Sequence, residues 1–153
     1  MTKKKWGQNF LINPNVIESI IKIAKVKIGD EILEIGPGSG NLTQALLDKQ
    51  SFVKAIEIDT KWCKYLTNRF KKEKNFTLLE MDVMGIPLIS FSKLTPRPSK
   101  VVANLPYNIV TPLLLKMLPI RGTWDSLTLM VQKKLQKEFV QNQIQAKLLE
   151  LYL

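Results

Sequence analysis

The sequence predicts an α/β protein built on a parallel β-sheet, and three observations lead to that fold class. Short strand-like segments alternate with segments whose apolar residues recur at helical spacing, which is the pattern of consecutive βαβ units. A glycine-rich loop at residues 36–40 directly follows the first strand-like segment, and Asn104 directly follows a later one. Because an open α/β sheet binds ligands at the carboxyl ends of its strands, both features indicate one site at that edge.

Capping residues and hydrophobic spacing place the individual elements. Asn13 and Pro14 are typical of an N-cap and a first helical residue, and Asp59 or Thr60 is expected to cap a later helix. A further helix is expected behind Pro112. Apolar residues at helical spacing predict helices at positions 16–24, 42–47, 62–70 and 111–118. Strands are expected at residues 31–35, 52–58, 76–81, 100–103 and 127–131, joined by right-handed crossovers.

Composition limits the classes of protein to which the chain can belong. A length of 153 residues with 45% hydrophobic content suits one globular core. The net charge of +10 suits a phosphate-bearing partner, although a solvated cationic surface explains it equally well. Cys63 is the only cysteine and histidine is absent, so neither a disulfide nor a transition-metal site is expected. No apolar run reaches membrane-spanning length and the basic N-terminus lacks a signal-like apolar core, so the cytoplasm is the expected compartment.

The glycine loop indicates the kind of cofactor. Its spacing is G-x-G-x-G after Glu34, whereas a dinucleotide site requires G-x-G-x-x-G. This difference favours S-adenosylmethionine, whose carboxylate suits a helix N-terminus and whose sulfonium tolerates acidic neighbours. Gly36 and Gly38 would let the backbone approach this methyl donor closely. Glu57, at the end of the second strand, would accept hydrogen bonds from the ribose hydroxyls of the methyl donor. Asp82 would accept a hydrogen bond from the exocyclic amine of the donor's adenine.

Each of these residues also has an ordinary structural explanation. The glycines can simply form a tight turn between a strand and a helix. Glu57 can be a plain strand-end carboxylate and Asp82 a plain turn residue. Their joint placement after three successive strands favours the ligand site over these separate explanations.

The segment Asn104-Leu105-Pro106-Tyr107 indicates a site for an amino group on a planar base. Such an amine is a weak nucleophile because its lone pair is delocalised into the ring. The Asn104 side chain and the Pro106 carbonyl could accept its N–H groups, and Pro106 would hold that carbonyl rigidly. Tyr107 offers a face for stacking, worth roughly 1–3 kcal/mol per base, and transfer would rely on proximity. An isolated turn of this kind is more often a plain β-turn, but this one lies behind a methyl-donor loop.

A set of motifs runs from residue 5 to about residue 133. Its members are Gln8-Asn9-Phe10-Leu11, the segment from Glu34 to Thr43, Glu57-Ile58-Asp59, Asp82 and Asn104-Leu105-Pro106-Tyr107. As a set they resemble the ribosomal RNA adenine N6,N6-dimethyltransferases, and best the small-subunit branch. The resemblance implies a Rossmann-like class I S-adenosylmethionine-dependent methyltransferase sheet. It also implies dimethylation of two adjacent adenosines near the 3′ end of small-subunit ribosomal RNA.

The resemblance further implies particular contacts and partners. Asn9 and Leu11 would contact the methyl donor, as would Gly36, Glu57, Asp82 and Asn104, while Tyr107 would stack on the target adenine. The substrate would be the immature small ribosomal subunit, with no membrane partner, and the protein would act as a monomer.

Three other readings of these motifs stay open. Erythromycin-resistance methylases of large-subunit RNA share this layout but usually carry isoleucine at the position of Leu105. Methyltransferases of DNA adenine or of protein amides more often carry Pro-Pro-Tyr or Pro-Pro-Phe in this turn, so Leu105 disfavours them. A third reading is a truncated, non-catalytic product that only binds the methyl donor or RNA.

The segment after residue 133 departs from the resembled family. Family members continue with further strands and a helical C-terminal domain, whereas this chain ends at Leu153. We therefore expect a partial catalytic domain at residues 1–133, an atypical tail at 134–153, and no C-terminal helical domain; the alternative for the tail is a genuine terminal helix. The sheet would be incomplete, with about five parallel strands. The strand containing Leu127, Leu129 and Val131 would then form an unpaired apolar edge.

A frameshift near Lys133 and Lys134 is one hypothesis for the tail. Back-translating residues 134–153 with A/T-rich codons and reading two bases onward gives a string with Val-Ala, an Arg, a Pro and Gly-x-Leu-Ser in the family's order. Consecutive lysine codons would provide an A-rich slippery tract at this point. We predict that the other frame of the gene stays open and encodes the missing strands and the C-terminal domain. A stop codon soon after this point in that frame would show that the tail is genuine.

Overall fold

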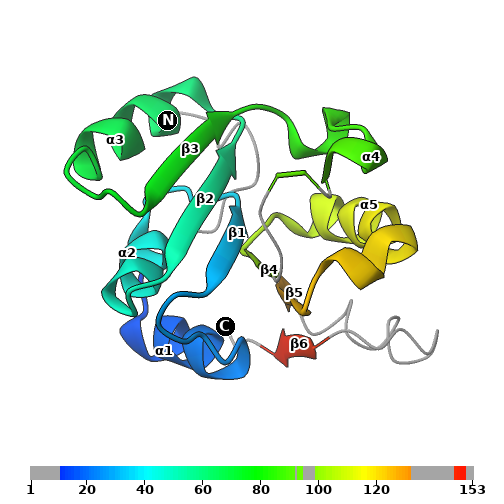
Figure 1. The fold of residues 1–153 in the computed structure, drawn as a ribbon, viewed down its shortest axis with the longest axis horizontal. Coiled ribbons are helices and arrows are strands. Elements are labelled where there is room, and N and C mark those ends of the chain that lie inside the picture. The colour runs from blue at the N-terminus through cyan, green and yellow to red at the C-terminus, as the bar shows by residue number, and fades with distance from the viewer. Residues whose placement is uncertain (1–10, 92, 95–98, 132–146, 151–153) are drawn as a thin grey trace, which may run out of the picture.

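The computed structural model describes residues 11–91, 93–94, 99–131 and 147–150, and it contains one sheet of six strands (Figure 1). The strand order is β3-β2-β1-β4-β5-β6, and every neighbouring pair is parallel. The strands are β1 (Glu31–Ile35), β2 (Phe52–Glu57), β3 (Phe76–Glu80), β4 (Ser99–Ala103), β5 (Ser126–Val131) and β6 (Lys147–Glu150). The five strands expected from the sequence are confirmed, each to within one residue at either end.

The sixth strand, β6, corrects the expectation of an unpaired edge at β5. Leu129 lies opposite Leu148, and Val131 lies opposite Glu150, in a parallel ladder. An apolar strand such as β5 exposes unpaired N–H and C=O groups, and pairing with β6 satisfies those along one side. At residues 147–150 the tail is therefore a strand, not the terminal helix that its composition offered as an alternative.

Helices cover both faces of the sheet (Figure 1). α1 (Pro14–Ile23), α2 (Asn41–Asp48) and α3 (Thr60–Arg69) lie on one face, and α4 (Leu88–Phe91) and α5 (Tyr107–Met117) lie on the other. Short 3₁₀ turns occur at η1 (Val83–Gly85) and η2 (Leu118–Thr123). The expected caps are confirmed, since the Asn13 side chain accepts from the Asn15 N–H and Asp59 from the Lys61 N–H. In the described part of the chain, no helix combines the length and apolar character that a bilayer crossing requires.

α5 begins four residues earlier than the sequence predicted. Pro106 is its N-cap and Tyr107 its first residue, so Pro112 lies inside the helix. The sequence placed Pro112 in the first turn, where a missing N–H costs nothing. Inside the helix, that missing N–H removes one intrahelical hydrogen bond. Burial of Val110, Leu113, Leu114 and Met117 against the sheet offsets this loss.

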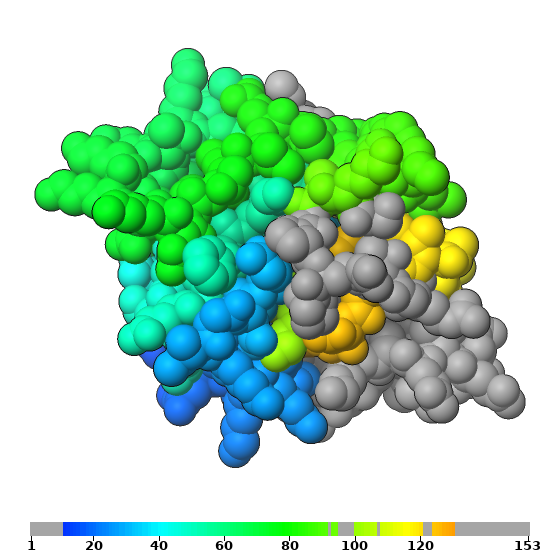
Figure 2. Space-filling view, viewed as in Figure 1, coloured from blue at the N-terminus to red at the C-terminus, as the bar shows by residue number. Residues whose placement is uncertain are grey.

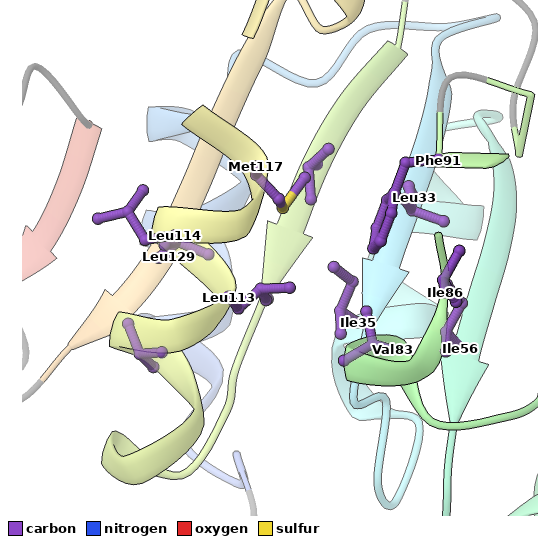
Figure 3. Packing of buried hydrophobic residues seen from close by; sticks show 13 residues of the cluster. Leu33, Ile35, Ile56, Val83, Ile86, Phe91, Leu113, Leu114, Met117 and Leu129 are labelled. Atoms are coloured by element: carbon purple, nitrogen blue, oxygen red, sulfur yellow. The ribbon is translucent and has the colours of Figure 1, made fainter. Parts of the chain in front are cut away.

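Two apolar clusters hold the layers together. On the α5 side, Leu113 and Met117 face the sheet residues Leu33 and Ile35, and Phe91 of α4 closes the cluster (Figure 3). The opposite cluster joins α1, α2 and α3 to the other face and consists of Ile20, Ile21, Ala24, Ile32, Leu42, Leu46, Leu47, Val53, Leu66, Phe70 and Val102. In the space-filling view, α3 and β3 form the upper left of the visible surface and α1, in blue, its lower rim (Figure 2).

Candidate functional site

The candidate site lies at the carboxyl ends of β1 and β4, where the order in which strands are added to the sheet reverses. β1 has β2 on one side and β4 on the other. The strands that follow β1 are therefore added first on one side of it (β2 and β3) and then on the other (β4, β5 and β6). Ile35 and Ala103 end their strands directly opposite each other. The glycine loop and the Asn104 turn therefore begin side by side, at the position where open α/β sheets bind their ligands.

Gly36 allows this close approach. Its φ is +72°, and a Cβ built on it would lie 2.7 Å from Leu105 Cδ2 and 3.6 Å from the Asn104 carbonyl oxygen. The space that a side chain would need is filled by the Asn104 turn. A ligand at this point would meet the bare backbone of the loop and the Asn104 turn together.

Glu57 supports the loop from below. Its carboxylate accepts three backbone N–H groups: Oε1 from Ile58 at 2.9 Å and Asp59 at 3.0 Å, and Oε2 from Gly38 at 3.2 Å. Glu57 is only 4% exposed. A carboxylate has about four acceptor positions, so one position on Oε2 is left for a hydroxyl group. The bond to Gly38 is the longest of the three and the one that a ligand could most readily replace.

Glu34 is a second buried carboxyl group beneath the loop, and the sequence assigned it no role of its own. It is 1% exposed, its Oε2 accepts from the Thr43 hydroxyl at 2.7 Å, and its Oε1 has no partner within the described structure. The pKa of Glu34 is raised from 4.5 to about 7, chiefly by burial; the Thr43 hydrogen bond opposes this increase and the nearby Glu57 adds to it. The carboxyl is therefore partly protonated near neutral pH, which reduces the charge carried into the interior.

We expect Glu34→Gln to change how stability depends on pH. In the unfolded chain Glu34 ionises near pH 4.5, whereas in the fold it holds its proton up to about pH 7. Between these values the unfolded state binds fewer protons, so the parent loses stability as pH rises, by about 3 kcal/mol in total. Glutamine does not ionise, so the free energy of unfolding of Glu34→Gln in urea should rise relative to that of the parent by about this amount between pH 4.5 and pH 8. Glu31→Gln is the control for net charge, and a difference between parent and Glu34→Gln that stays constant with pH would contradict the prediction.

The site edge is locally acidic although the chain as a whole carries +10. The pKa of Cys63 is sensitive to this negative field, because the buried thiol, which is 4% exposed, donates to the Glu57 carbonyl oxygen at 3.6 Å. The pKa of Cys63 is raised to about 11, first by burial and then by Glu80, Glu57 and Asp59. A field that disfavours a thiolate favours a cationic ligand.

The other residues expected at the site have mixed positions. Asp82 directly follows the residue after β3, is exposed, and caps η1 by accepting from the Met84 N–H at 2.8 Å. The carbonyl of Leu11 accepts from the Asn41 side chain at the start of α2, at 3.0 Å. Asn9 and the side chain of Tyr107 lie outside the described part of the structure.

The carbonyl of Pro106 is not available for the role that the sequence gave it. It accepts from the N–H of Ile109 at 2.9 Å and of Val110 at 3.3 Å, because an N-cap carbonyl closes the first turn of its helix. Both acceptor positions are thus used by α5. The preceding carbonyl, that of Leu105, receives no backbone N–H from the described residues and precedes the helix. The sequence missed this because it placed the start of α5 too late.

Comparison with known proteins gives a consistent result. The family model described as ribosomal RNA adenine dimethylase matches residues 1–148. Ribosomal RNA small subunit methyltransferase A of Acaryochloris marina is 40% identical over 144 residues, which are 90% of this chain and 53% of that protein. The chain spans about half the length of the curated relatives it matches.

Solved structures show the same relationship. A dimethyladenosine transferase from Plasmodium falciparum has a TM-score of 0.73 and 32% identity, with coverage of 86% of this chain and 46% of its own. The 23S rRNA methyltransferase ErmE has a TM-score of 0.68 and 28% identity, with coverage of 79% and 47%. The sheet is thus the Rossmann-like sheet of class I methyltransferases. With a family model that matches nearly its whole length, the chain belongs to the ribosomal RNA adenine dimethylase family.

Proposed function

We propose that this protein uses S-adenosylmethionine to dimethylate N6 of two adjacent adenosines near the 3′ end of small-subunit ribosomal RNA. The observation that carries the proposal is the contact between Gly36 and the turn of Asn104 and Leu105. It brings a loop suited to a methyl donor against a turn suited to an aryl amine. The names of the relatives support the choice of RNA. We further propose that it acts in the cytoplasm, as a monomer, on the immature small ribosomal subunit.

The residues at the site fit S-adenosylmethionine. The free acceptor position on Glu57 Oε2 suits a ribose hydroxyl, and the acidic field suits the cationic sulfonium and ammonium groups. The loop backbone and the N-terminus of α2 suit the carboxylate. Asp82 would accept from the adenine amine, and Asn9, Leu11 and Gly38 would line the ligand. When bound, this cofactor supplies an electrophilic methyl group on sulfur.

The chain's own groups orient the target amine. The Asn104 side-chain oxygen and the Leu105 carbonyl are two neighbouring acceptors at the end of β4, and each could accept one N–H of the amine. Two accepted hydrogen bonds favour a pyramidal nitrogen with a localised lone pair. Tyr107, the first residue of α5, would stack on the adenine ring. Catalysis would then depend on position rather than on a strong base.

We expect Glu57→Ala to weaken binding of S-adenosylmethionine by about 1–3 kcal/mol, because it removes the ribose acceptor and frees the Gly38 N–H. Titration calorimetry measures this directly. Glu18→Ala is the control, because Glu18 is an exposed carboxylate of α1 and does not belong to the acidic edge of the site. Equal affinities of Glu57→Ala and the parent would count against this site for the methyl donor.

The substrate is tested by transfer of labelled methyl groups onto purified ribosomal subunits that lack these methylations. The proposal expects label in two adjacent adenosines of the small-subunit RNA. Label in large-subunit RNA instead would favour the activity named for ErmE. Binding of the methyl donor without any transfer would support the alternative of a non-catalytic product.

A further inference from the structure

Arg69, the last residue of α3, contacts the glycine loop. Its Nη1 donates to the Ser39 carbonyl at 2.5 Å and to Asn41 Oδ1 at 3.2 Å. Asn41 in turn donates from Nδ2 to the Leu11 carbonyl at 3.0 Å. Four residues thus connect the end of α3, the glycine loop, the start of α2 and the segment before α1. We call this set the Arg69 clamp (Arg69, Ser39, Asn41 and Leu11).

Packing holds Arg69 in place. The guanidinium carbon lies 5.1 Å from the centroid of the Phe70 ring, and Phe70 packs on Phe76 with the ring centroids 4.8 Å apart. Phe70 is 3% exposed and occupies the space that a Cβ on Gly40 would need, at 2.8 Å. The last turn of α3 therefore fits against the loop through both a buried ring and an exposed cation.

The loop needs such support because its backbone is intrinsically free. Gly36, Gly38 and Gly40 all have positive φ, between +53° and +78°. Glycines lose more conformational freedom on ordering than other residues, so a ligand that had to order this loop would bind more weakly. Glu57 holds the loop at the Gly38 N–H, and Arg69 holds the next residue at its carbonyl.

We propose that Arg69 and Asn41 are positioning residues that hold the glycine loop and the Leu11 segment in the conformation that binds the methyl donor. The role in binding rests on the proposed function, whereas the clamp itself can be measured without any ligand. By composition alone, Arg69 belongs to the basic run with Lys71 and Lys72, which suits an RNA phosphate contact. The bonds to Ser39 and Asn41 instead direct its Nη1 toward the glycine loop and the start of α2.

The experiment compares Arg69→Gln, Arg69→Lys and Asn41→Ala with the control Lys72→Gln, which removes a charge just beyond α3. In the ligand-free protein, amide hydrogen exchange of residues 36–42 should rise about tenfold in Arg69→Gln and stay unchanged in Lys72→Gln. The dissociation constant for S-adenosylmethionine should rise about threefold to tenfold in Arg69→Gln, with KM for RNA unchanged. Arg69→Lys should behave like Arg69→Gln, because a lysine ammonium ends one bond short of the position of Nη1, the atom that donates to both acceptors. The double variant Asn41→Ala with Arg69→Gln should lose less binding free energy for S-adenosylmethionine than the sum of the two single losses, since both residues act in one hydrogen-bond network.

The outcomes separate the clamp from the proposed function. Unchanged loop exchange in Arg69→Gln would overturn the clamp. If loop exchange is faster in Arg69→Gln but the parent protein binds no S-adenosylmethionine, the proposed function and the clamp's role in binding are both overturned. An unchanged dissociation constant, with a raised KM for RNA that Arg69→Lys restores, would identify Arg69 as a phosphate contact and overturn the proposal.

Discussion

Replacing Asn104 with alanine is expected to slow methyl transfer by about 100-fold or more, the size of loss seen when one oriented polar group is removed from a reacting centre. The side-chain oxygen of Asn104 is one of two acceptors proposed for the target amine. Without it, the amine keeps its lone pair delocalised and its orientation free. Single-turnover transfer of labelled methyl groups to small-subunit RNA measures this loss, and calorimetry measures the accompanying change in methyl-donor affinity.

Two companion variants make the result specific. Asn108→Ala changes the same residue type on the exposed surface of the first turn of α5 and should transfer at the parent rate. Tyr107→Ala should lower transfer, because stacking on the target base contributes roughly 1–3 kcal/mol. Methyl-donor affinity should stay unchanged, because the proposed contact of Tyr107 is with the target adenine. The proposed roles are wrong if Asn104→Ala or Tyr107→Ala transfers as fast as Asn108→Ala.

Gly40→Ala is expected to destabilise the fold by about 4 kcal/mol, from left-handed strain of about 1–2 kcal/mol together with overpacking of about 1–3 kcal/mol. The φ of Gly40 is +78°, and an added Cβ would lie 2.7 Å from Leu66 Cδ2 and 2.8 Å from Phe70 Cε2. Leu66 and Phe70 are both buried, so neither can move into solvent. Urea unfolding followed by circular dichroism measures the loss.

Gly29→Ala separates the two contributions. Gly29 has nearly the same φ, +79°, but nothing lies within 4 Å of a Cβ built there. This variant should therefore lose only the strain, about 1–2 kcal/mol. Equal losses at Gly29 and Gly40 would show that α3 does not press on the loop.

Local signals in the sequence were sufficient for most of the fold. Caps and periodicity act over a few residues, so Asn13, Asp59 and the first five strands could be identified without tertiary information. β6 could not, because its pairing with the edge of β5 is a tertiary contact that the pattern of four residues does not indicate. The start of α5 was misplaced because Pro112 resembles a first-turn proline, whereas apolar burial keeps it inside the helix.

The sequence by itself determined which residues could form the site. The G-x-G-x-G loop, Glu57 and the Asn104 turn were identified because each directly follows a strand, and parallel strands end at one edge. Only the tertiary structure decided what their atoms do. It assigned the Pro106 carbonyl to α5, gave Glu57 three N–H groups to hold, and directed Arg69 onto the loop. The bonds from Gly38 to Glu57 and from Arg69 to Ser39 join residues 19 and 30 positions apart, which spacing along the chain does not encode.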